Sequence, residues 1–157
     1  MVKPLRMEGG DIDDVDARIL EALVHNARIS IAELARTVGM SAPSVSERVR
    51  RLEETGAITG YTAIVNPAVL GRPLAIMLRI RPVPGKLREV ADLIKNIPDI
   101  VECVRVTGED CYVARAHVRS VDDLEALIDR IVPHSMTTTS IIQSSPVERR
   151  LPPLSVN

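Results

Sequence analysis

Residues 30–56 read SIAELARTVGMSAPSVSERVRRLEETG, in which two short amphipathic segments lie on either side of Gly39. Ser30 followed three positions later by Glu33 is a capping box, since each side chain can satisfy a free backbone donor of the first helical turn. The apolar residues that follow recur at helical spacing: Leu34, Ala35 and Val38. We therefore expect a short helix that begins after Ser30 and ends at Gly39.

The second segment predicts another helix, which Ser41 caps at its amino end and Gly56 stops. Pro43 is tolerated in the first turn, where a missing N–H breaks no helical hydrogen bond. The inward apolar stripe of this second helix consists of Val45, Val49 and Leu52. A sharp turn at Gly39, with small Ala35 letting the two helices cross closely, is typical of a helix-turn-helix motif.

Upstream of this motif, an acidic amphipathic segment predicts a helix from Asp13 to about Asn26. Its apolar positions are Ile12, Val15, Ile19, Leu20 and Leu23. Residues 11–60 are therefore expected to form a three-helix DNA-binding domain. Residues 1–10, which end in two glycines, are expected to be disordered.

The outward side of the 41–56 helix combines short polar side chains with arginines, which suit base edges and phosphates in the major groove. The candidate contacts with double-stranded DNA are Ser41, Pro43, Ser44, Ser46, Glu47, Arg48, Arg50 and Arg51. The alternative interpretation is a solvated charged helix face. Because the whole chain has a net charge of only -1, phosphate contacts must come from a local basic face.

In the second half of the chain, residues 74–148, the apolar residues recur with a different spacing. The expected elements are a strand at 74–80, a helix at 87–97, strands at 100–107 and 111–118, a helix from Ser120 to Ile131 and a strand at 137–144. This order is that of a ferredoxin-like βαββαβ domain. The whole chain is therefore predicted to be an α+β protein.

The segments before and after this domain are expected to form a linker and a tail. Residues 57–66 are predicted to form a turn and a strand, so that residues 61–73 make a strand-bearing linker. Residues 149–157 are interpreted as a C-terminal tail.

Several segments are similar to those of one family of regulators: DARILEAL from Asp16, ARISIAELA from Ala27, VGMS from Val38, RVRRLE from Arg48 and GAITGY from Gly56. Over about residues 11–148 the chain resembles the Lrp/AsnC regulators, also called feast/famine regulatory proteins. The resemblance implies a winged helix-turn-helix joined by a strand-bearing linker to a ferredoxin-like domain. It also implies dimers whose sheets pack together, commonly assembled into octamers, with amino acids as frequent effectors bound between dimers.

The resemblance places an effector site at the turn between the second and third strands of the sheet domain and along its last strand. The candidate residues are Thr107, Gly108, Glu109, Asp110, Thr137, Thr138, Thr139 and Ser140. Cys111 stands where the family has an aspartate, and Asp110 lies one place earlier. An acidic turn can hold an ammonium group, and hydroxyls can take a carboxylate. The alternative is ordinary hairpin and strand chemistry without a ligand.

An oligomer is expected on separate grounds. The two helices of a ferredoxin-like domain cover one sheet face, and the other face still carries Ala75, Met77, Val104 and Val106. A partner subunit would remove these side chains from water. The sequence thus predicts at least a homodimer.

The remaining composition narrows the function classes. The chain has two Tyr, no Phe and no Trp, which disfavours single-strand nucleic-acid binding by aromatic stacking. The two cysteines lack metal-ligand spacing, and we expect no metal, no cofactor and no catalytic residues. No apolar run is long enough for a membrane span and no cleavable signal is seen, so a cytoplasmic protein is expected.

The favoured hypothesis is a sequence-specific transcriptional regulator that responds to a small effector, such as an amino acid. One alternative is an enzyme resembling siroheme decarboxylases of the same fold, which would have to use His117 and Arg115. Another is a ligand-sensing protein that does not bind DNA.

Overall fold

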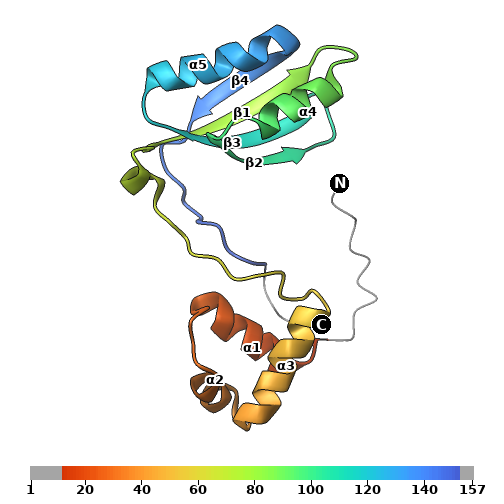
Figure 1. Ribbon diagram of the computed structural model, residues 1–157, viewed down its shortest axis with the longest axis vertical. Coiled ribbons are helices and arrows are strands. Elements are labelled where there is room, and N and C mark those ends of the chain that lie inside the picture. The colour runs from red at the N-terminus through yellow and green to blue at the C-terminus, as the bar shows by residue number, and fades with distance from the viewer. Residues whose placement is uncertain (1–11, 153–157) are drawn as a thin grey trace. The chain divides into compact units, whose positions relative to one another are not determined.

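The computed structural model describes residues 12–152, which fold into two units (Figure 1). One unit is helical and comprises the described residues up to Ala63 together with those from Arg149 onward. The other, Ile64–Glu148, is built on a β-sheet. The proposed disordered stretch, residues 1–10, lies outside the described residues. Within the described part of the chain, no helix is long and apolar enough to cross a bilayer.

The helical unit contains the three expected helices: α1 (Asp14–His25), α2 (Ile31–Val38) and α3 (Ala42–Glu54). The side chains of Asp13, Ser30 and Ser41 cap their amino ends. Gly39 adopts a left-handed conformation (φ 73°), the region that glycine enters without steric cost. The core of the helical unit consists of Ile19, Leu34, Ala35, Val38, Val45 and Leu52. The helix-turn-helix prediction is confirmed.

The capping-box prediction was misplaced. Ser30 accepts a hydrogen bond from the backbone N–H of Glu33 (3.2 Å), but the reciprocal bond from the Ser30 backbone is not formed. The complete box is at α1, where Asp13 and Asp16 each accept a bond from the other's backbone N–H. Asp serves here because its short carboxylate reaches the same donors as the Ser/Glu pair.

The structure does not form the strand expected within residues 57–66. The single chain therefore has neither the strand-bearing wing nor the strand-bearing linker that was expected. Residues 57–58 form a bend, residues 59–66 have no regular secondary structure, and a 3-10 helix, Pro67–Leu70, follows them. A strand needs a neighbouring strand to bind its backbone groups. No described strand of this chain pairs with the segment, so its backbone groups form no strand ladder.

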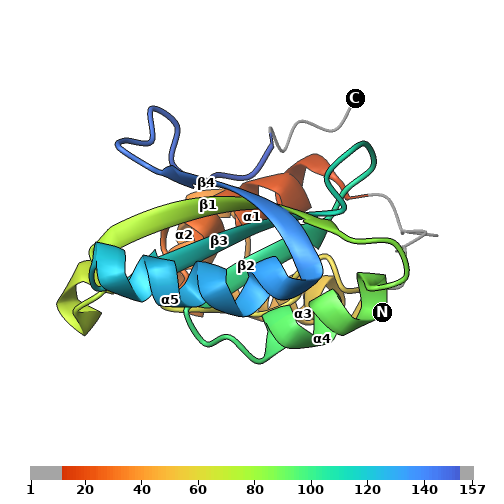
Figure 2. The same cartoon turned by 90° about the horizontal axis from the view of Figure 1, so that it is seen from above.

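The sheet unit has the predicted βαββαβ order: β1 (Leu74–Pro82), α4 (Leu87–Lys95), β2 (Ile100–Arg105), β3 (Tyr112–Val118), α5 (Val121–Ile131) and β4 (Ser135–Ile141). The strand order is β2-β3-β1-β4, and every neighbouring pair is antiparallel. Both helices cover the same face of this sheet (Figure 2). The ferredoxin-like prediction is confirmed.

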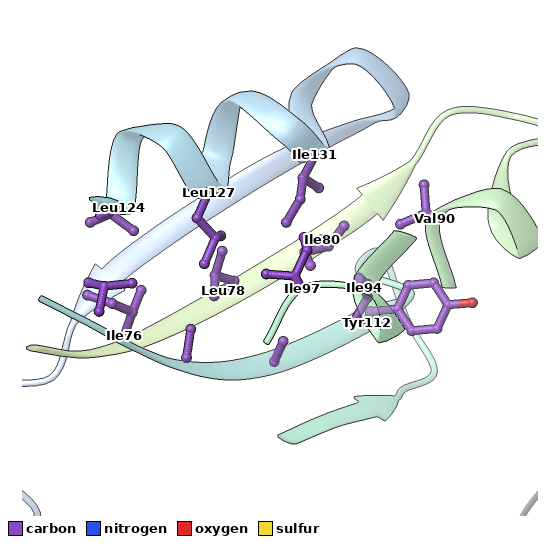
Figure 3. Packing of buried hydrophobic residues seen from close by; sticks show 13 residues of the cluster. Ile76, Leu78, Ile80, Val90, Ile94, Ile97, Tyr112, Leu124, Leu127 and Ile131 are labelled. Carbon is purple, nitrogen blue, oxygen red and sulfur yellow. The ribbon is translucent and has the colours of Figure 1, made fainter. Parts of the chain in front are cut away.

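The core of this unit lies between the sheet and its two helices (Figure 3). Ile76, Leu78 and Ile80 of β1 point at α4 and α5, and all three are fully buried. Tyr112, also in the core, donates a hydrogen bond from its hydroxyl to the carbonyl oxygen of Leu87 (3.1 Å). The last strand begins at Ser135 rather than Thr137, because Ser135 already pairs with Pro82 and its hydroxyl bonds the Ile131 carbonyl oxygen.

The alternate residues of the strands point to the face that carries no helix, which we call the open face. On β1 it presents Ala75, Met77, Arg79 and Arg81. Across the sheet it carries Val104, Val113, Arg115, His117 and Thr138. Val104 is 49% exposed, so apolar surface on this face is uncovered in the single chain.

Candidate DNA-contacting helix and effector loop

Local sequence chemistry fixes the amino end of α3. The Ser41 hydroxyl accepts from the Ser44 backbone N–H (3.3 Å) and lies 2.7 Å from the Ser44 hydroxyl. Val45 and Leu52 are buried against α1 and α2. The amino-terminal half of α3 is therefore capped and packed with its polar side outward.

Most of the candidate DNA contacts on α3 are open to solvent. The exposed ones are Ser41, Pro43, Ser44, Ser46, Glu47, Arg50 and Arg51, while Arg48 is half-buried. Serine hydroxyls can donate to or accept from base edges, a carboxylate can accept from cytosine N4, and arginine binds guanine or phosphate. The exposed surface thus has the chemistry needed to read a major groove.

Arg50 lies in a surface ion-pair ladder. It donates to Glu47, one turn earlier (Nε to Oε2 3.1 Å), and to Glu54 (NH1 to Oε1 2.5 Å). The hydrogen bonds from Arg50 lower the pKa of Glu47. All three side chains are more than half exposed, and such pairs are cheap to break. Arg50 is therefore available to a phosphate or a base that offers a better acceptor.

Arg48 and Arg51 are bound differently, because both reach back to α1. Arg48 NH1 donates to Asp16 Oδ1 (2.7 Å) and to Asp13 Oδ2 (2.7 Å), and Arg51 NH2 donates to Asp16 Oδ2 (2.5 Å). Asp16 is only 1% exposed. The Asp16 backbone N–H, together with Arg48, holds the pKa of the Asp13 carboxyl below its usual range.

Sequence reasoning grouped Arg48 and Arg51 with Arg50 and missed their carboxylate partner. The only sequence signal is an i, i+3 arginine pair beside the inward stripe and an aspartate in the first turn of the preceding acidic helix. Neither signal says that the two meet. Arg48, Arg51, Asp13 and Asp16 are hereafter called the α1–α3 ion cluster.

Two ion pairs hold the candidate effector loop onto the open face. Arg79 Nε donates to Asp110 Oδ2 (2.7 Å), and Arg81 NH2 donates to Glu109 Oε2 (2.5 Å). Gly108 turns the chain with a φ of 108°, a conformation that favours glycine. The sequence had indicated this loop, and the structure adds Arg79 and Arg81, which sequence reasoning missed.

The four hydroxyl residues of β4 separate onto two faces. Thr138 is the register partner of Arg79 and Ser140 that of Met77, and both are exposed on the open face. Thr137 and Thr139 pair with Ile80 and Leu78, on the face covered by the helices, and both are half-buried. Because side chains alternate along a strand, the two sets point to opposite faces of the sheet. Thr138 is the hydroxyl placed nearest in register to the arginines.

The other titratable groups of residues 12–152 form no centre of their own. Among the described residues, no group of three His, Cys, Asp or Glu side chains is placed to hold a metal ion. His134 pairs with Glu89 (2.9 Å) beside α4. Arg115 and His117, which an enzyme of this fold would have to use, both lie on the open face.

Two family models match the chain, one for each unit. The AsnC-type helix-turn-helix domain matches residues 12–53, and the Lrp/AsnC ligand binding domain matches residues 75–152. The first match includes all of α1 and α2 and α3 up to Glu53, and the second includes the effector loop and β4.

Individual relatives agree with these models over most of the chain. YezC of Bacillus subtilis, an HTH-type transcriptional regulator, is 37% identical over 134 residues, which are 85% of this chain and 95% of YezC. The structure of Bacillus subtilis LrpC is 31% identical, covers 89% of this chain and 100% of LrpC, and has a TM-score of 0.84.

A solved feast or famine regulatory protein of Mycobacterium tuberculosis, complexed with L-methionine, is 32% identical. The match covers 91% of this chain and 99% of that one, with a TM-score of 0.83. With both units matched, the chain belongs to the Lrp/AsnC family of transcriptional regulators.

Proposed function

We propose that this chain is a transcriptional regulator that binds double-stranded DNA through α3. The observation that carries the proposal is the exposed, capped amino-terminal half of α3, with its polar residues outward and Val45 buried. In helix-turn-helix proteins, base contacts come from this part of the recognition helix. The contact set that we propose is Ser41, Pro43, Ser44, Ser46, Glu47 and Arg50.

The Arg50 side chain carries the first prediction. Arg50→Ala is expected to weaken binding to the protein's own promoter region and to an unrelated duplex alike, and to reduce the salt slope of log K by about one. The measurement is a fluorescence-anisotropy titration at four salt concentrations. Arg119→Ala, with the same charge change in the sheet unit, is the matched control and should leave the slope unchanged. An unchanged slope in Arg50→Ala removes Arg50 from the contact set, and no DNA binding by the wild type at low salt overturns the proposed function.

The same proposal assigns a small zwitterionic effector, such as an amino acid, to the loop around Gly108. A carboxylate can take the guanidinium of Arg79 and the Thr138 hydroxyl, while an ammonium group takes Asp110, so a zwitterion can replace the internal Arg79–Asp110 pair without leaving a charge unpaired. The L-methionine complex of the Mycobacterium tuberculosis relative supports this class of ligand. Thr107 and Glu109 frame the loop, and Thr137, Thr139 and Ser140 belong to its supporting strand.

An Asp110 variant tests this site. Asp110→Asn is expected to weaken the binding of a responsive amino acid by roughly tenfold to a hundredfold, because a hydrogen bond to a charged partner contributes about 1.5–3 kcal/mol. The measurement is calorimetric titration after a screen of twenty amino acids by thermal shift. Asp92→Asn, which breaks an exposed ion pair with Lys95 on α4, is the control. Equal affinity in both variants places the effector elsewhere.

We further propose that the chain works as a homodimer, in the cytoplasm. Two separate surfaces carry exposed apolar side chains: the open face, where Val104 is 49% exposed, and the segment after α3, where Ile64 is 98% and Val65 53% exposed. An isologous partner can cover the open face with its own, and can give residues 57–66 the neighbouring strand that they lack. Assembly into octamers is a further prediction of family membership.

A further inference from the structure

The burial of Asp16 is more than its place in the α1 capping box requires. It lies in the first turn of α1, where acidic residues usually face water and favour the positive end of the helix dipole. Asp14, in the same turn, is exposed, whereas Asp16 is 1% exposed and accepts hydrogen bonds from two arginines of α3. A carboxylate buried this deeply is stable only when it is paired.

The pairing neutralises most of the positive charge of α3. Two of the three α3 arginines, Arg48 and Arg51, bind Asp16, and Asp13 adds a second carboxylate to Arg48. Within the α1–α3 ion cluster two carboxylates balance two guanidinium groups. Arg50 is then the α3 cation that is held only by exposed glutamates.

This arrangement matters because affinity for arbitrary DNA depends on how many phosphates a protein neutralises. Arg51 is 53% exposed, so it lies at the surface while its charge is directed inward. Released from Asp16, Arg51 would be free to find a phosphate on any sequence, and Arg48 would keep only its pair with the exposed Asp13, which a phosphate can replace. In residues 12–63 acidic side chains also outnumber basic ones, so one or two arginines made available to phosphates would be a large change.

We infer that Asp16 is a specificity-determining positioning residue, which keeps Arg48 and Arg51 off the DNA backbone and so lowers affinity for unrelated DNA relative to the operator. The inference rests on the proposed DNA binding through α3. Asp16 acts through the two arginines and touches no base or phosphate itself.

The test uses Asp16→Asn in the full chain, with Asp14→Asn as the matched control. Both variants remove one negative charge from the same helical turn, but no ion pair of Asp14 with another described residue is formed. The readout is the salt dependence of affinity for an unrelated duplex and for the protein's own promoter region. Circular dichroism verifies that each variant is folded at the temperature used.

Asp16→Asn is expected to steepen the salt slope for the unrelated duplex by about one for the released Arg51, and by about two where Arg48 also exchanges Asp13 for a phosphate. The promoter affinity should rise less, so the ratio of promoter to unrelated binding narrows. Asp14→Asn should leave that slope nearly unchanged. Adding Arg51→Ala to Asp16→Asn should take away about one unit of the gained slope.

A second variant keeps the test valid if Asp16→Asn does not fold. Arg51→Ala alone leaves Asp16 paired with Arg48 and should not change the wild-type slope, since Arg51 makes no phosphate contact when held by Asp16. A slope reduced by about one in Arg51→Ala, or equal slopes in Asp16→Asn and Asp14→Asn, overturns the inference while the regulator stands. Failure of the wild type to bind any duplex overturns the proposed function itself, and this inference with it.

Discussion

Leu78→Ala is expected to lower the free energy of unfolding of the sheet unit by roughly 3 kcal/mol, within the range of about 2–5 kcal/mol seen for buried leucines. Leu78 is fully buried at the middle of β1, beneath Leu127 of α5 (Figure 3). Its strand pairs with both β3 and β4, so neither neighbour can move in to fill the cavity without disturbing the sheet.

Tyrosine fluorescence measures this change in one unit at a time. The chain has two Tyr and no Trp, and Tyr112 lies in the sheet core while Tyr61 belongs to the helical unit. In a Tyr61→Phe background, urea unfolding at fixed protein concentration therefore reports the sheet unit alone. Leu78→Met, which nearly conserves volume, should cost less than about 1.5 kcal/mol. A loss below about 1 kcal/mol for Leu78→Ala contradicts the packing described for this core.

Ile64→Asp is expected to weaken the homodimer by roughly a hundredfold or more, because an unpaired charge at a buried interface costs about 3 kcal/mol or more. In the single chain Ile64 is 98% exposed, so the aspartate disturbs no internal contact. Any effect is therefore on the assembly. Light scattering across a protein dilution series measures it.

Val121→Asp is the matched control for this substitution. Val121 is 52% exposed at the amino end of α5, where an acidic residue is favourable, and it lies outside the two surfaces proposed to meet the partner. It should leave the oligomer unchanged. An Ile64→Asp protein that keeps the wild-type mass at every dilution shows that the segment after α3 is not part of the interface.

The helices were predictable because their signals are local. Ser30 and Ser41 cap the helices that follow them, and the stripe of Val45, Val49 and Leu52 gives one face of α3. Each signal acts within one or two turns of its own residue. The same holds for β1 and β3, whose alternating side chains predict strands without knowledge of their neighbours.

The sequence was least informative where a local pattern needed a distant partner. Residues 57–66 have strand-like composition, but in the single chain they have no strand to pair with. Thr137 and Thr139 were grouped with Thr138, although the register of β4 against β1 places them on the opposite face. Register depends on the whole sheet, so a run of hydroxyl residues does not reveal which of them share a face.

The sequence by itself determined the helix-turn-helix, the βαββαβ order and the exposed polar side of α3, since caps, periodicity and turn glycines act over a few residues. Tertiary structure alone decided which charges neutralise one another. Arg51 meets Asp16 across 35 residues of sequence and Arg79 meets Asp110 across 31. Charged side chains find partners by distance in the folded protein, and the strength of their interaction depends on burial. Neither the distance between two charges in the folded protein nor their burial can be predicted from the spacing of residues along the chain.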